Sequence, residues 1–74
     1  TEGGVNMTNV KELEKVIEES GLSNTECAAG LGMSVPTFIS RRRGESEFKA
    51  SEIVRATILF GLTRDRRDLI FLAE

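Results

Sequence analysis

Three consecutive arginines, Arg41, Arg42 and Arg43, precede the final glycine of the segment GLGMSVPTFISRRRG, which spans residues 30–44. A cluster of guanidinium groups on a helix can bind an anion such as phosphate. The same run at a helix end is also typical of a solvated surface that complements the helix dipole. Which of the two interpretations is favoured depends on the elements that position the arginines.

The positive charge of the chain is concentrated in this region. The formal net charge is −2: residues 1–33 carry two lysines and six glutamates, residues 34–49 carry a balance of +2, and residues 50–74 are neutral. An acidic total argues against non-specific coating of nucleic acid, whereas a local basic segment permits binding to an anion.

Start and stop signals for helices divide the chain into five helices, and no segment has the pattern of a strand. The predicted helices are residues 10–20, a short helix between Ser23 and Gly32, residues 35–43, residues 50–60, and a last helix that follows Thr63. Pro36 falls in the first turn of the third helix, where a missing N–H costs nothing. The chain is therefore predicted to be an all-α, compact five-helix domain over residues 9–74, preceded by a flexible segment over residues 1–8.

Apolar residues at helical spacing predict the core. The candidates are Val10, Leu13, Val16 and Ile17; Cys27, Ala28 and Leu31; Phe48; Ile53, Ala56, Thr57 and Phe60, with Val54 and Ile58 widening that stripe; and Leu69, Ile70, Phe71 and Leu72. The wide stripe on residues 50–60 predicts a central helix. The single cysteine cannot form an internal disulfide and is interpreted as a small buried side chain.

The second and third helices have the pattern of a helix-turn-helix. Ala28 is small enough for the third helix to cross closely, and Gly32 permits the positive φ that sets the angle between the helices. Met33 and Phe38 are the apolar anchors of the third helix. Together with the caps Ser23 and Ser34, this spacing favours contact of at least one arginine with DNA.

The segment LSNTECAAGLGMSVPTFISRRRGESEF resembles the helix-turn-helix of phage repressor and Cro-like regulators, the xenobiotic-response-element type. The segment SEIVRATILFGLTRDRRDLIF is similar to their fourth and fifth helices, in particular those of small single-domain phage regulators of Gram-positive bacteria. The resemblance implies a lambda-repressor-like fold, binding to operator DNA with the third helix in the major groove, and action as a homodimer. Asn24 matches the family position that often grips a phosphate.

A helical wheel with Phe38 directed into the core identifies the residues expected to face DNA. The candidate DNA-binding residues are Asn24, Ser34, Val35, Pro36, Thr37, Ile39, Ser40 and Arg43, with Arg41, Arg42 and Lys49 as possible phosphate contacts. Arg41 and Arg42 fall nearer the core side, so they either brace the end of the helix or extend to phosphates.

The predicted function is that of a DNA-binding transcriptional regulator in the cytoplasm. An enzyme is the least favoured class, because the chain has no histidine, glycine-rich phosphate loop or metal-ligand spacing, and no cofactor is expected. The alternative is a protein-interaction module, such as an antirepressor or antitoxin-like subunit, that uses Val35 and Ile39. Homodimer contact is expected through the last helix, with Leu69, Phe71 and Leu72.

Overall fold

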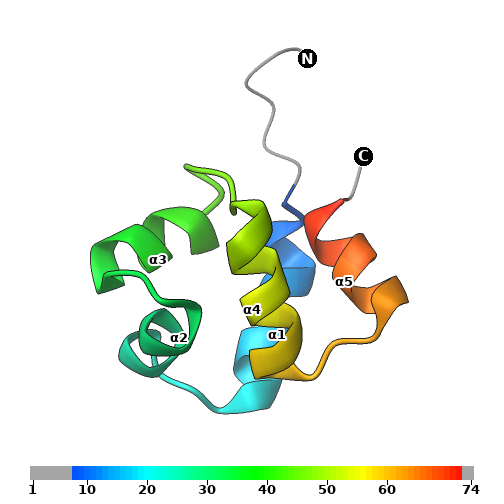
Figure 1. Cartoon of the computed structure of the whole chain (residues 1–74), viewed down its shortest axis with the longest axis horizontal. Helices are drawn as coiled ribbons and strands as arrows, with labels where there is room; N and C mark the ends of the chain where they lie inside the picture. Colours follow the sequence, from blue (N-terminus) through cyan, green and yellow to red (C-terminus); the bar gives the residue numbers. More distant parts are fainter. Residues whose placement is uncertain (1–7, 73–74) are drawn as a thin grey trace.

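The computed structural model describes residues 8–72, which form five helices joined by short turns (Figure 1). The helices are α1 (Val10–Ser20), α2 (Asn24–Leu31), α3 (Val35–Arg42), α4 (Ala50–Phe60) and α5 (Arg64–Phe71). The predicted all-α, five-helix fold is confirmed. Apart from Thr8, the predicted flexible segment 1–8 lies outside the described residues. None of the described helices combines the length and the apolar character needed to cross a membrane.

Side-chain caps fix the helix starts where the sequence predicts them. The Asn9 side chain accepts a bond from the Glu12 backbone N–H, and Ser23 and Glu26 form a reciprocal capping box. Such caps satisfy N–H groups that have no partner within the helix. Helix α3 ends one residue earlier than predicted, with Arg43 as its C-cap residue.

The helices pack around a central pair. In Figure 1, α1 and α4 lie in the middle, α2 and α3 lie on one side, and α5 lies on the other. The backbone N–H of Asn9 donates to the carbonyl oxygen of Ile70 over 2.6 Å, which fastens the start of α1 to α5. The pair α2–α3 is thus held against a body made by α1, α4 and α5.

Every helix and the loop before α4 contribute to one core. Its buried members are Leu13, Val16, Ile17, Cys27, Ala28, Leu31, Phe38, Phe48, Ala56, Ile70 and Phe71. Phe48 enters the core from the loop, as predicted, and its ring meets Phe71 edge to face with centroids 5.0 Å apart. This arrangement suits the aromatic quadrupoles.

Two predictions about the apolar faces are wrong. Val54 and Ile58 do not widen a buried stripe on α4, because they are 59% and 77% exposed. Ala56 is the only residue of α4 that is buried, and no described element covers the outer side of this helix. On α5, Ile70 and Phe71 are buried, whereas Leu69 and Leu72 are exposed.

Candidate nucleic-acid interface

The turn between α2 and α3 has the geometry that the sequence predicts. Gly32 adopts a φ of +73°, in the left-handed region that disfavours side chains, and the Met33 N–H donates back to the Ala28 carbonyl oxygen. Ala28 and Phe38 are buried, so α3 is anchored on α2 through its inner face. The turn and these anchors set the angle between the two helices.

Gly30 is a further determinant of this geometry, and the sequence reasoning missed it. A Cβ atom at Gly30 would lie 2.9 Å from two Leu59 methyl carbons, closer than real Cβ atoms come to other atoms. A side chain at this position would therefore require the Leu59 side chain on α4 to move. The small residues around Gly30 were the available signal, but the partner helix was unknown.

The outer side of α3 is open to solvent. Ser34, Pro36 and Arg43 are exposed, and Thr37, Ile39 and Ser40 are half-buried. Val35 is also half-buried and packs against the core, so it presents less surface than expected. The Ser34 hydroxyl caps the helix and donates to the Thr37 hydroxyl oxygen over 2.8 Å. The Thr37 O–H is consequently free to donate outward.

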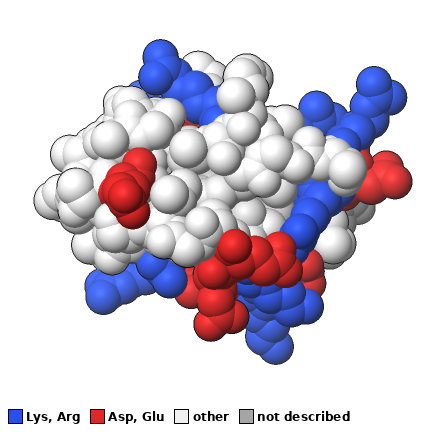
Figure 2. Space-filling view, turned by 90° about the horizontal axis from the view of Figure 1, so that it is seen from below, with Lys and Arg blue, Asp and Glu red and all other residues white. Residues whose placement is uncertain are grey.

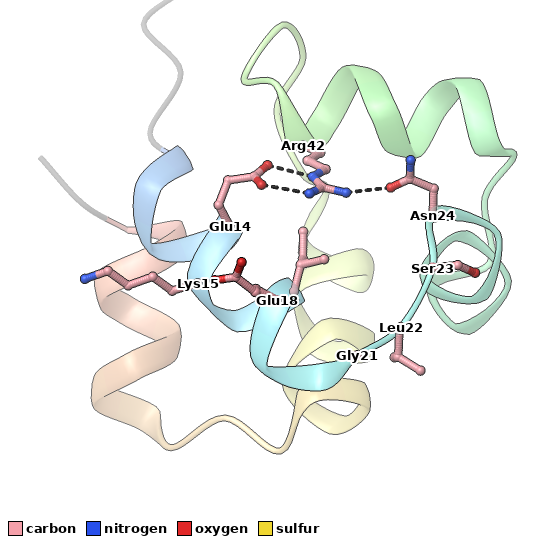
Figure 3. A pocket seen from close by; sticks show the side chains of 9 residues that line it. Glu14, Lys15, Glu18, Gly21, Leu22, Ser23, Asn24 and Arg42 are labelled. Atoms are coloured by element: carbon pink, nitrogen blue, oxygen red, sulfur yellow. Dashed lines mark hydrogen bonds and ion pairs between the residues drawn. The ribbon is translucent and has the colours of Figure 1, made fainter.

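Arg42 joins three helices within the monomer (Figure 3). Its Nε and Nη2 donate to the two carboxylate oxygens of Glu14 on α1 over 2.6 and 2.7 Å, and its Nη1 donates to Asn24 Oδ1 on α2 over 2.6 Å. The hydrogen bonds from Arg42 hold the pKa of Glu14 below its usual value, although burial opposes this shift. The same ion pair shifts the pKa of Arg42 in the opposite direction: the hydrogen bond to Glu14 raises it. Arg42 therefore braces the end of α3, one of the two roles expected for it.

The Arg42 contact also fixes the orientation of the Asn24 amide. A guanidinium group only donates hydrogen bonds, so the atom of Asn24 that faces Arg42 must be the carbonyl oxygen. The Nδ2 group of Asn24, with its two N–H donors, is then left for other partners. Asn24 begins α2, where free backbone N–H groups and the helix dipole favour anions.

Arg41 makes a second internal ion pair. Its Nε and Nη2 donate to Glu52 on α4, and the two side chains are only 12% and 13% exposed. Burial alone would raise the pKa of Glu52, but the bonds from Arg41 and from the Lys49 backbone N–H outweigh it, so the pKa lies below its usual value. Arg41 also donates to Ser46 Oγ. It too is a brace between helices.

Of the three arginines only Arg43 projects without an ion pair within residues 8–72. It lines a hollow of about 210 Å³ together with Glu14, Asn24, Ile39 and Arg42. Because Arg42 neutralises Glu14 beside it, the hollow combines one free cation with the amide of Asn24. Ser40 is less available than expected, because its hydroxyl is bonded to that of Ser46 over 3.0 Å. Lys49 is exposed and stands just before α4.

Charge on the rest of the molecule is mixed. Figure 2 views the end of the molecule at which α1 and α4 terminate; the centre of this face is uncharged, an acidic group lies within its left part, and acidic and basic side chains lie along its edges. No general basic coat is visible on this face.

Among residues 8–72, no group of three or more His, Cys, Asp or Glu side chains could hold a metal ion. Burial raises the pKa of the Cys27 thiol.

Comparison with models of protein families, with curated protein sequences and with solved structures gives no match to this chain.

Proposed function

We propose that the protein is a sequence-specific DNA-binding regulator whose helix α3 enters the major groove of an operator. The observation that carries the proposal is the two-sided character of α3. Its inner face is locked by Phe38, which is fully buried, while Pro36 and Arg43 on its outer side are open. An α-helix presented in this way fits the width of the major groove of B-DNA.

The polar groups around α3 suit a phosphate backbone and base edges. Arg43 supplies the free positive charge, and the Asn24 amide with the start of α2 supplies neutral donors for a phosphate. Ser34 and Thr37 offer hydroxyls at the start of α3, and Ile39 offers methyl groups that can meet thymine. Arg41 and Arg42 position the helix in this proposal, since their charges are already paired within the protein.

Selection of bound sequences from a pool of random duplexes tests the proposal. We expect enrichment of a short consensus, and we expect Arg43→Ala to weaken binding to it. Arg64→Ala is the matched control, because Arg64 is an exposed arginine on α5 without an ion pair in the described chain. Failure to enrich any sequence, or equal effects of the two substitutions, would contradict the proposed role of α3.

The alternative of a protein-interaction module predicts a different result. In that case α3 would bind a protein through Val35 and Ile39, and duplex DNA would not bind. These two side chains are half-buried, so they offer a partner little apolar surface. The large apolar side chains that are exposed lie elsewhere, on α4 and α5.

A further inference from the structure

Arg55 on α4 lies against the turn that joins α2 to α3, although the sequence assigned it no role. A Cβ atom at Gly32 would lie 2.7 Å from Nη1 of Arg55 and 3.3 Å from its Cζ, so the guanidinium group covers the backbone of the turn. The side chain of Arg55 is nevertheless exposed. A positive charge therefore stands at the surface just before α3 begins.

The packing of α4 on α2 places Arg55 at this turn. Leu59 lies one helical turn further along α4 on the same face, and its side chain fits against Gly30. The glycines at positions 30 and 32 thus face Leu59 and Arg55 respectively. The stem of Arg55 is held at one end by a contact between helices, while its charged head reaches solvent.

The helices around Arg55 do not neutralise its charge. Helices α2 and α4 contain one acidic residue each, Glu26 and Glu52, and α3 contains none. Glu26 is engaged in the capping box at the far end of α2, and Glu52 pairs with Arg41. In the described part of the chain, no ion pair or hydrogen bond joins Arg55 to another residue. The N–H groups of Arg55 are therefore left for solvent or for an anion.

We propose that Arg55 binds a phosphate of the operator backbone, separate from the phosphate that Arg43 binds. The inference rests on the proposed function, since it takes α3 to lie in the major groove. Arg43 is the C-cap residue of α3, whereas Arg55 lies beside the turn before α3, so the two arginines stand beyond opposite ends of this helix. The eight residues of α3 span about 12 Å, and one phosphate cannot serve both guanidinium groups.

The spacing of the two arginines suits the major groove. This groove is about 12 Å wide in B-DNA, and charged phosphates border it on both strands. A helix of this length with a cation beyond each end can reach both borders. The start of α3 also carries a partial positive charge from the helix dipole, which favours a phosphate on the side where Arg55 lies.

A structural role for Arg55 is the competing explanation. Gly32 is the C-cap residue of α2, and the negative end of that helix dipole attracts a cation whether or not DNA is present. This role predicts that loss of the Arg55 charge lowers the Tm and leaves the salt dependence of DNA binding unchanged. The phosphate contact predicts the reverse, because an exposed side chain without bonds contributes little to stability.

The salt dependence of binding to the duplex enriched from the random pool tests the proposal, measured by fluorescence anisotropy between about 50 and about 200 mM KCl. We expect Arg55→Ala to reduce the magnitude of the slope of the logarithm of the binding constant against the logarithm of the salt concentration by about 0.9, the contribution of one phosphate. Arg55→Lys should keep the slope, because it keeps the charge. Arg64→Ala, at an exposed arginine of α5, is the matched control and should keep it as well.

The double variant Arg43→Ala, Arg55→Ala counts the phosphates. Each single substitution should lower the magnitude of the slope by about 0.9, and the two together by about 1.8. A fall of only about 0.9 in the double variant, with equal falls in the two single variants, would mean that both arginines serve one phosphate and would overturn the inference. An unchanged slope in Arg55→Ala, with or without a lower Tm, would overturn it too.

The outcome for Arg55 can be told apart from the outcome for the proposed function. If no duplex binds, the proposed function and this inference both fail. If the duplex binds with the same salt dependence in the parent and in Arg55→Ala, while Arg43→Ala changes it, only this inference fails.

Discussion

Replacement of Arg42 by methionine tests whether this arginine is a brace between helices or a ligand for DNA. The substitution keeps an unbranched stem and removes three charge-assisted hydrogen bonds of 2.6 to 2.7 Å to Glu14 and Asn24. Bonds to charged groups contribute about 1.5–3 kcal/mol when well buried. Arg42 is 28% and Glu14 43% exposed, so solvent screens the pair. We therefore expect the free energy of unfolding to fall by about 1–2 kcal/mol for the whole set.

Urea unfolding followed by circular dichroism at neutral pH measures this loss. A thermal melt gives a second measure of the loss. In a domain of this size each kcal/mol lowers the Tm by about 4–8 °C, so the expected decrease is roughly 5–15 °C. Arg43→Met is the matched control, because the same change at an exposed and unpaired arginine should leave stability within about 0.5 kcal/mol. A double-mutant cycle with Glu14→Gln isolates the pair. Equal stability of the parent and Arg42→Met, or equal losses at Arg42 and Arg43, would refute the assignment.

Three further predictions follow from the described contacts. If Arg43 pairs with one phosphate, Arg43→Ala should reduce the magnitude of the slope of the logarithm of the DNA-binding constant against the logarithm of the salt concentration by about 0.9. An unchanged slope in a filter-binding titration would show that Arg43 does not contact a phosphate. Stability should be retained above the ordinary glutamate pKa of about 4.3 and lost as the pH falls through the lowered pKa values of Glu14 and Glu52, which acid titration followed by circular dichroism would show. A stability that does not change as the pH falls below about 4.3 would contradict this prediction. Gly32→Ala should cost about 1–2 kcal/mol by chemical denaturation, because an alanine at φ +73° is strained; a neutral effect would show that the turn can relax.

Local signals made most of the fold predictable. The caps at Asn9, Ser23, Ser34 and Thr63 act within three residues of each helix start, so the sequence alone locates them. Phe48 could be predicted as a core residue because it is the only large apolar group of its loop. The helix-turn-helix geometry followed from Gly32 together with its flanking anchors.

Contacts between distant segments were not predictable in the same way. Periodicity identified the apolar stripe of α4 but not how much of it other helices cover, so Val54 and Ile58 were misassigned to the core. Arg42 and Glu14 are 28 residues apart, and nothing local identifies one as the partner of the other. The importance of Gly30 likewise depends on Leu59 of α4. In the candidate site, the sequence located α3 correctly. Which arginines form ion pairs within the protein could be seen only in the structure.

A titration of the ¹⁵N-labelled protein with its selected duplex, followed by ¹H–¹⁵N correlation spectra, tests the central claim most directly. If α3 enters the major groove, the amides of Thr37, Arg43 and the Asn24 side chain should shift most, while that of Arg64 on α5 should stay in place. Shifts confined to α4 and α5, or none in residues 34–43 while DNA is bound, would contradict the account.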